Sequence, residues 1–244
     1  MNIKNIFFTV CLLLIICQTI SAQNFIMPDS SCYNSVGYLK NKCYACSSND
    51  SLEDCKVEEF GYLGNIKNKY YYYQISLSYD SANTGIVDSG YNTTNLVILE
   101  GDKSKSNVKS IYEHSDARGV IYFLKPDLVN TEYGWILHIN MSSGNGGWDL
   151  GSYFIFERGK WYKLKIPAFL KAFGALIPKD YWFCRGSSID LKNMTIVFRV
   201  FKKDDACCCP TGGIVKAKLK VTDNNEIIIL NNKYFPDTQN NTQY

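Results

Sequence analysis

The side chains best suited to chemistry in this chain are cysteines. Cys43 and Cys46 form a C-x-x-C pair in a polar stretch, and three further cysteines are consecutive at 207–209, just before Pro210. Thiolates in such patterns attack disulfides or bind zinc. A redox centre of the thioredoxin type would need a βαβ context, which this sequence lacks. A zinc site stays open as an alternative, with the ligands Cys43, Cys46, Cys207 and Cys209.

Disulfides are the interpretation that the start of the chain favours. A basic residue, Lys4, precedes an apolar run from Ile6 to Cys17, and small residues follow at Ser21 and Ala22. This order is typical of a cleavable export signal, and the run is too short to span a membrane. We therefore expect removal of residues 1–22, a secreted or periplasmic protein, and no membrane span after cleavage. Cysteines of exported proteins are usually oxidised.

Eight cysteines remain after loss of the signal, and we expect all of them to be in disulfides. Consecutive Cα atoms are about 3.8 Å apart, below the usual disulfide separation of about 4.4 Å or more, so pairing inside the triplet is disfavoured. Each triplet cysteine then needs an outside partner, and at least two must pair with the early group. This predicts that the N-terminal segment lies against the hairpin 201–214. The eight are Cys32, Cys43, Cys46, Cys55, Cys184, Cys207, Cys208 and Cys209.

Groups for acid–base or nucleophilic catalysis form no recognisable motif. The chain has two histidines, each in a predicted strand, and it has no nucleophile elbow, no zinc-protease helix motif and no phosphate-binding glycine loop. We predict no catalytic residue and no cofactor. A glycosidase needs only two suitably spaced carboxylates, so a polymer-acting hydrolase stays as an alternative function. The acids that lie among aromatic residues, which we interpret as solvated turn and edge residues, are Asp149, Glu157, Asp180 and Asp190.

Aromatic residues make up 14% of the chain and suggest a different chemistry, the stacking of sugars. Indole and phenol rings combine a flat apolar face with a polar edge, which suits this contact. Core packing also uses aromatic residues, so the composition motivates a glycan site without locating it. The candidate platform residues are Trp148, Trp161, Tyr181 and Trp182.

The elements that would position these residues are mostly strands. Segments rich in β-branched and aromatic residues recur between turn signals such as Arg158-Gly159. In the segment 214–221, lysines alternate with apolar residues, which predicts a half-buried strand with one solvated side. The predicted strands are 70–79, 95–99, 108–114, 119–124, 134–141, 153–157, 161–166, 195–201, 214–221 and 226–230.

We therefore predict an all-β, mostly antiparallel fold, either a sandwich or a curved sheet, with a barrel or propeller-like arrangement as the alternative. One short helix is expected within 167–176, and disulfides should tie the N-terminal segment to the rest. The expected parts of the chain are a signal peptide at 1–22, a Cys-rich N-terminal segment at 23–60, a β-rich domain at 61–235 and a disordered tail at 236–244.

Charge limits the choice of partner. The formal net charge is +3, and it falls to +2 when Lys4 leaves with the signal. Binding to nucleic acid normally requires a clustered basic face, which the linear sequence does not suggest. We therefore expect a glycan or protein partner and no nucleic acid.

The stretch from Gly134 to Gly213 carries a glycine-rich turn, SSGNGGWDLGS, then YFIFERGKWYKL and later DACCCPTGG. In these motifs it resembles uncharacterised exported bacterial β-rich proteins with a Cys-Cys-Pro-Ser/Thr element near the C-terminal end. The resemblance implies export and a β-rich architecture, and it transfers no functional residue. The expected function is that of an exported, disulfide-stabilised, non-catalytic module that binds a partner or has a role in the envelope.

Overall fold

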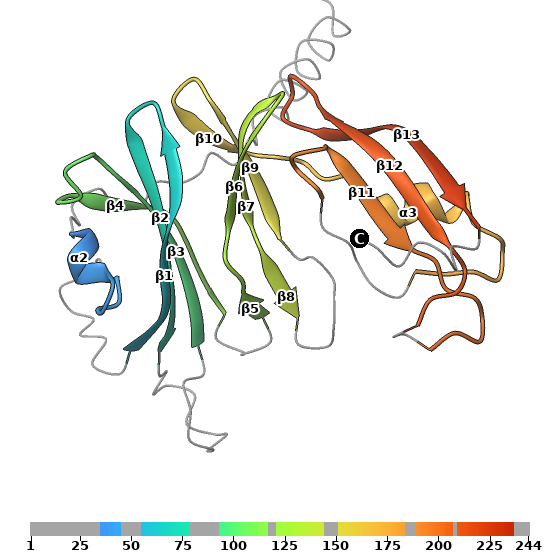
Figure 1. The fold of residues 1–244 in the computed structure, drawn as a ribbon, viewed down its shortest axis with the longest axis horizontal. Coiled ribbons are helices and arrows are strands. Elements are labelled where there is room, and N and C mark those ends of the chain that lie inside the picture. The colour runs from blue at the N-terminus through green and yellow to red at the C-terminus, as the bar shows by residue number, and fades with distance from the viewer. Residues whose placement is uncertain are drawn as a thin grey trace, which may run out of the picture.

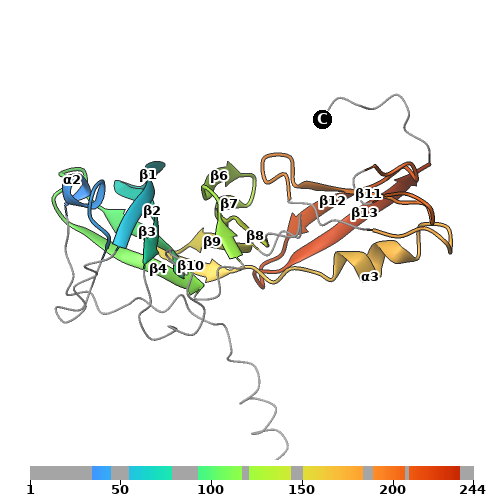
Figure 2. The same cartoon turned by 90° about the horizontal axis from the view of Figure 1, so that it is seen from below.

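The structure is a computed structural model that describes residues 35–44, 55–78, 93–116, 121–143, 151–183, 189–206 and 209–236. Within these residues the chain forms three antiparallel sheets and one two-stranded pair. The three sheets follow one another along the long axis of the molecule (Figures 1 and 2). The first and third sheets therefore lie at opposite ends.

The first sheet contains four strands in sequence order: β1 (Cys55–Ile66), β2 (Lys69–Ser78), β3 (Thr93–Gly101) and β4 (Val108–Asp116). Two residues, Lys67 and Asn68, join β1 to β2, and both have a positive φ, 48° and 67°. This is the conformation of a type I′ turn, whose twist matches that of the flanking strands. The turn thus sets the register of the first hairpin.

The second sheet lies in the middle of the molecule and has the order β10-β9-β7-β6. Its strands are β6 (Asp127–Thr131), β7 (Gly134–Ile139), β9 (Ser152–Glu157) and β10 (Lys160–Lys163). A separate pair consists of β5 (Ile121–Phe123) and β8 (Met141–Ser143). Arg158 and Gly159 form the β9–β10 turn, again with two positive φ angles, 48° and 83°.

The third sheet contains β11 (Thr195–Arg199), β12 (Ile214–Val221) and β13 (Ile227–Phe235), with β12 in the centre. Helix α3 (Phe169–Gly174) packs on one side of it. Its Phe173 ring meets Phe198 of β11 edge-on at 5.4 Å between centroids. One face of this sheet is therefore buried by the helix and its flanking loops.

The middle sheet contributes side chains to two hydrophobic cores, one on each face. Ile136 and Ile155 belong to the core shared with the third sheet, whereas Leu137 and Phe154 belong to the core shared with the first sheet. Successive side chains of a strand point to opposite faces, so strands covered on both sides read as continuous apolar runs. This arrangement explains the segments WILHI and YFIF in β7 and β9.

A third core lies on the outer face of the first sheet, where residues 35–44 cover the strands. Val36 and Leu39 of α2 (Val36–Leu39) pack there with Tyr44 against Leu99 and other side chains of the sheet. Leu39 is fully buried, and burial of a leucine side chain contributes about 1.5–3 kcal/mol. We call residues 35–44 the N-terminal cover.

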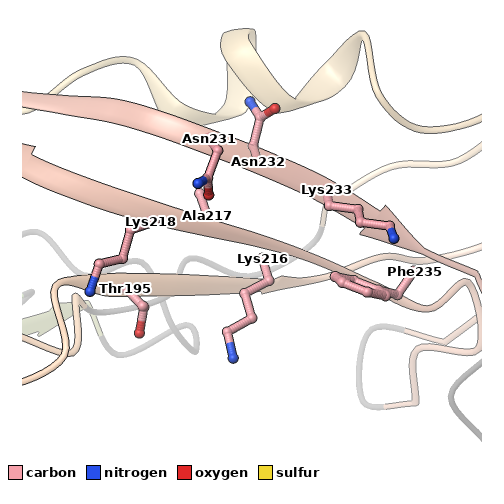
Figure 3. Close-up of a pocket in the computed structure, with 8 residues that line it drawn as sticks. All are labelled: Thr195, Lys216, Ala217, Lys218, Asn231, Asn232, Lys233 and Phe235. Atoms are coloured by element: carbon pink, nitrogen blue, oxygen red, sulfur yellow. The ribbon is translucent and has the colours of Figure 1, made fainter.

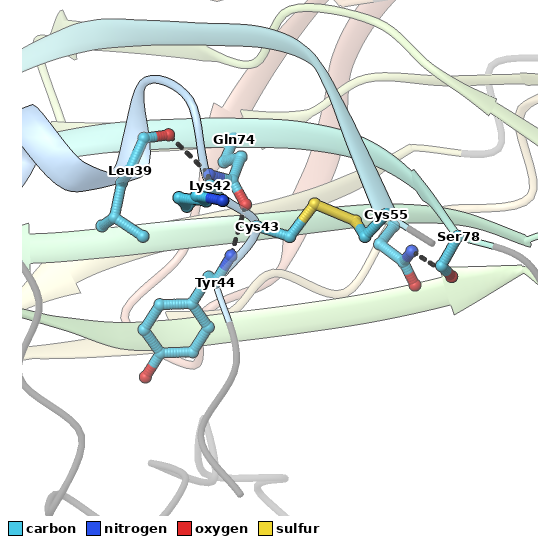
Figure 4. The surroundings of a disulfide bond; sticks show 8 residues. Leu39, Lys42, Cys43, Tyr44, Cys55, Gln74 and Ser78 are labelled. Atoms are coloured by element: carbon cyan, nitrogen blue, oxygen red, sulfur yellow. Dashed lines mark hydrogen bonds between the residues drawn. A yellow bond between two sulfur atoms is a disulfide. The ribbon is translucent and has the colours of Figure 1, made fainter. Parts of the chain in front are cut away.

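Gln74 of β2 holds this cover through three hydrogen bonds (Figure 4). Its Nε2 donates to the carbonyl oxygens of Leu39 and Lys42 at 2.7 and 2.9 Å, and its Oε1 accepts from the backbone N–H of Tyr44 at 2.8 Å. The Gln74 side chain is fully buried, so each of these bonds replaces a bond to water.

A disulfide between Cys43 and Cys55 attaches the end of the cover to the start of β1 (Figure 4). The two cysteines are 12 residues apart. In the chain-entropy model a loop of this size contributes about 3 kcal/mol, because the crosslink restricts the unfolded chain. The predicted disulfide at the N-terminal segment is present. Both of its cysteines lie within residues 23–60, and it ties residues 35–44 to the first sheet because β1 begins at Cys55.

The all-β, mostly antiparallel fold is also confirmed, and the sheets do not close into a barrel. Every predicted strand overlaps an observed one, although 134–141 divides into β7 and part of β8. Helix α3 lies inside the predicted helix 167–176. β1, β6 and α2 were not predicted from the sequence. The proposed segment boundary at 60/61 falls inside β1, whose residues from Cys55 onward pair with β2.

The expected location of the N-terminal segment is wrong for its described part. Residues 35–44 pack on the first sheet, at the opposite end of the molecule from the hairpin 201–214 (Figures 1 and 2). The cause is the outer face of the first sheet, which is apolar and requires a cover. Cys32, Cys46, Cys184, Cys207 and Cys208 lie outside the described residues, so their pairing stays a prediction.

Candidate functional site

The zinc alternative is contradicted at one of its four ligands. Cys43 is bonded to Cys55 and therefore has no thiolate to offer a metal. Cys209 is exposed in the connection between β11 and β12, and the other two proposed ligands, Cys46 and Cys207, are outside the described residues. Within the described part of the chain, no group of three or more His, Cys, Asp or Glu side chains gathers as a metal site would require.

The connection that carries Cys209 is organised by Asp205. Its carboxylate accepts hydrogen bonds from the backbone N–H of Lys202 at 2.8 Å and of Thr211 at 2.7 Å, and from the Thr211 hydroxyl at 2.8 Å. These bonds, first among them the one from the Thr211 backbone, lower the pKa of Asp205. Gly212 passes so close to Val200, the residue after β11, that a Cβ at Gly212 would lie 2.8 Å from the Val200 carbonyl oxygen. Asp205 and Gly212 thus have structural roles.

The candidate acids lie on different elements. Glu157 ends β9, Asp180 is exposed in the turn after α3, and Asp190 precedes β11. Asp149 is outside the described residues. Hydrogen bonds from Asn193, first that of its side-chain amide at 2.7 Å, lower the pKa of Asp190. A general acid needs a raised pKa, so Asp190 is poorly suited to protonate a leaving group.

The candidate aromatic residues do not form one platform. Trp161 is buried in the core between the first and second sheets, where its ring contacts Tyr71 and Phe156 edge-on. Tyr181 is half-buried against the core of the third sheet. Trp182 is partly exposed, but its Nε1 donates to the Lys202 carbonyl oxygen at 3.1 Å and its ring packs on Phe201. Trp148 is outside the described residues.

A different surface stands out by its charge, the outer face of the third sheet. Alternation along β12 buries Val215, Ala217, Leu219 and Val221 in the core, as predicted for 214–221, and sends the intervening side chains outward. The strand register then places outward residues of β11 and β13 beside them. This surface, which we call the lysine face, carries five cationic side chains: Arg199, Lys216, Lys218, Lys220 and Lys233.

The register opposes two of these charges directly. Lys216 of β12 pairs with Lys233 of β13, and like charges at opposed positions of neighbouring strands destabilise a sheet. Within the described residues no ion pair involves any of the five cations. Lys218 Nζ donates to the Asn193 carbonyl oxygen at 2.7 Å, and Lys233 Nζ lies 5.1 Å from the centroid of the Phe235 ring. The face therefore concentrates positive charge at a cost in stability.

An open groove of about 440 Å³ crosses this face. Figure 3 shows Lys216, Lys218 and Thr195 projecting to the same side of the sheet, with Phe235 at one end. Thr195, Lys218 and Asn231 occupy one row across the three strands, so a hydroxyl and an amide flank the central ammonium. Such a surface can attract anions and donate hydrogen bonds to them.

This face corrects the argument that no basic residues cluster. The alternation of lysines in 214–221 is visible in the sequence, but the contributions of Arg199 and Lys233 depend on strand pairing over 15 and more residues of chain. From the sequence, the lysines were interpreted as the solvated side of a single strand, and the cations of the neighbouring strands were not combined with them.

Neither helix in the described residues is long and apolar enough to cross a membrane. Comparison with protein-family models and with curated proteins finds no match to this chain. We therefore base the proposed function on the lysine face and on the sequence.

Proposed function

We propose that this protein is an exported, non-catalytic binding module and that its lysine face binds an anionic ligand. The observation that carries the proposal is the direct opposition of Lys216 and Lys233 in a cluster of five cations that has no acidic partner among the described residues. An arrangement that lowers the stability of the free protein is expected where a ligand compensates for it. An anion between these ammonium groups would remove their repulsion.

Export is part of the same proposal, and the first 22 residues support it. The Cys43–Cys55 disulfide agrees with an oxidising compartment. Outside the cell the ligands with dense negative charge include acidic polysaccharides, acidic proteins and lipid surfaces. Non-catalytic binding fits the geometry, because the lysine face is an open sheet surface that carries charged and polar side chains beside half-buried apolar ones such as Val197 and Ile228.

A charge-reversal experiment tests the proposal. The variant K216E/K218E/K220E should bind polygalacturonate about a hundredfold more weakly than the unmodified protein at 0.15 M salt, since three surface charge contacts of about 1 kcal/mol each are lost. The matched control is K160E/K163E/K171E, which makes the same change in net charge at exposed lysines outside the face. Biolayer interferometry measures both.

Equal loss in the two triple variants would show that binding follows net charge and not the lysine face, which overturns the proposal. Absence of any binding by the unmodified protein to polygalacturonate, to heparin and to anionic vesicles would overturn it as well. Thermal unfolding of each variant checks that the fold is retained.

A further inference from the structure

The arrangement of charges within the lysine face narrows the class of ligand. Lys216, Lys218 and Lys220 alternate along β12, the central strand, and so form a straight row. Alternate residues of a strand are about 6.6–6.8 Å apart, which makes the row about 13 Å long. The other two cations lie to either side of it, Arg199 on β11 and Lys233 on β13. We call the three lysines of β12 the central row.

Lysines are compact charges on flexible stems, whereas arginines offer a planar fork that matches a single carboxylate or phosphate. A row of three lysines is therefore suited to a regular series of anions, each met by one ammonium group. The cations beside the row are less available. Lys233 is directed over the Phe235 ring, and Arg199 lies at the end of the face, opposite Ile214.

Uncharged polar groups lie beside the row. Thr195 and Asn231 flank Lys218 on the neighbouring strands, and both can exchange hydrogen bonds with hydroxyl groups. Phe235 is 37% exposed at one end of the face and offers apolar contact. Membrane-binding surfaces instead surround their lysines with protruding apolar side chains. In the same register Val197 lies beside Lys216 and Ile228 beside Lys220, but both are half-buried and do not protrude. The polar neighbours of Lys218 therefore favour a sugar polymer over a lipid surface.

We infer that the ligand is an acidic polysaccharide whose chain lies along β12, with its carboxylates on the central row. This inference rests on the proposed function and adds the ligand class and the direction of the bound chain. Charge complementarity supplies one ammonium group for each successive carboxylate. Hydroxyl groups of the intervening sugar rings then meet Thr195 and Asn231.

Single neutralisations distinguish a chain along β12 from diffuse attraction. The variants K216Q, K218Q and K220Q should each weaken binding of an oligogalacturonate long enough to span the central row by about fivefold, which corresponds to about 1 kcal/mol. Each should also lower the dependence of log K on log salt, by up to about one unit. R199Q, which removes the charge at the end of the face, should change the affinity less than twofold, and K233Q, which removes the charge opposite Lys216, should have an intermediate effect. Isothermal titration calorimetry at several salt concentrations measures all five variants.

Vesicles of phosphatidylcholine and phosphatidylglycerol form the second arm. Equal effects of the five neutralisations on the oligosaccharide, or tighter binding to the vesicles than to the oligosaccharide, would overturn the inference while leaving an anion-binding face in place. If the unmodified protein binds no polyanion at all, the proposed function itself is overturned. Because K218Q also removes the bond to the Asn193 carbonyl, K216Q and K220Q keep the test valid if K218Q unfolds.

Discussion

The outer faces of the first and third sheets lie at the two ends of the molecule. Both sheets are antiparallel, but the outer face of the first is covered by other residues of the chain and that of the third is exposed. The first face carries Tyr72, Val97 and Leu99, and the N-terminal cover buries it. The third face carries the five cations of the lysine face, and no described residue buries it. The choice of outward side chain on alternate positions accounts for this difference.

The comparison shows which forces act on each face. An apolar sheet face exposed to water costs free energy in proportion to its area, so the chain uses a helix turn, a glutamine clamp and a disulfide to cover it. A cationic face is readily hydrated, but the mutual repulsion of its charges lowers the stability of the folded protein, and a bound anion can relieve this repulsion. Changes that disturb the first face should therefore destabilise the fold, whereas changes to the third face should mainly affect binding.

Breaking the clamp under the cover should have the largest effect. Gln74→Leu removes three hydrogen bonds and leaves two carbonyl groups and one N–H of the cover without their partners. We expect a loss of about 3 kcal/mol or more in the free energy of unfolding, because each buried, unsatisfied group costs about 1–3 kcal/mol. Urea denaturation measures this loss.

The cover should also become easier to cleave in the Gln74→Leu variant, as limited proteolysis can report. Asn65→Leu on the exposed part of β1 is the control and should change the stability by less than about 0.5 kcal/mol. Equal stability of Gln74→Leu and the unmodified protein would contradict the assignment of Gln74 as the clamp.

A second prediction concerns the hydroxyl group of Tyr72, a polar group on the covered face of the first sheet. Its hydroxyl is buried and has no hydrogen-bond partner among the described residues. Desolvation first, and then the neighbouring Tyr62, Tyr70 and Asp102, raise the pKa of Tyr72 above its ordinary value of 10.0. Tyr72→Phe should therefore stabilise the protein by about 1 kcal/mol at neutral pH, because it removes an unsatisfied polar group.

The same variant should make the protein less sensitive to alkali. The unfolded tyrosine loses its proton near pH 10, before the folded one does, so ionisation of Tyr72 has no effect on stability below this pH and lowers the free energy of unfolding as the pH rises above it. Urea denaturation from pH 8 to 11 should show a smaller decline for Tyr72→Phe. An identical decline would mean that other groups cause the alkaline loss. Tyr122→Phe, at an exposed tyrosine, is the control.

The smallest expected effect has the opposite sign to that at Gln74. Lys233→Gln removes one of two opposed like charges on the lysine face and should raise the free energy of unfolding by about 0.5 kcal/mol at low salt. Salt screens the repulsion, so the gain should shrink at 0.5 M salt. Paired thermal melts at both salt concentrations check this result. A destabilised variant would show that the cation–π contact with Phe235 outweighs the repulsion.

Strands were predictable wherever one rule applied over the whole segment. Lys216 and its neighbours alternate without interruption, and the four-tyrosine run of β2 is strongly β-forming, so both segments were placed correctly. β1 was missed because bulges at Val57/Glu59 and Tyr62/Gly64 break its period of two. β6 is only five residues long and half-buried, which leaves little pattern to detect.

The candidate site was predictable only in part, because its components come from three strands. Lys216, Lys218 and Lys220 are adjacent in the sequence, but their significance depends on Lys233 and Arg199. Pairing brings these two residues to the same surface from separate segments. Conversely, the sequence made Trp161 a candidate for a sugar-stacking platform on the surface, but the fold buries its side chain in a core. Amino-acid type sets what a residue can do, and burial sets whether it is available.

Local patterns in the chain were sufficient to establish an antiparallel β protein, the alternation of β12 and the presence of a crosslinked N-terminal segment, since these follow from side-chain period and cysteine position. These local patterns did not show where the N-terminal segment packs. The sequence suggested the hairpin 201–214, whereas residues 35–44, the described part of the segment before β1, pack on the first sheet, because the apolar outer face of that sheet exists only once β1–β4 have paired. The lysine face likewise exists only after β11, β12 and β13 are in register. Pairing between strands that are distant in the sequence decides which side chains share a surface, and this pairing cannot be inferred from the residues adjacent to each side chain.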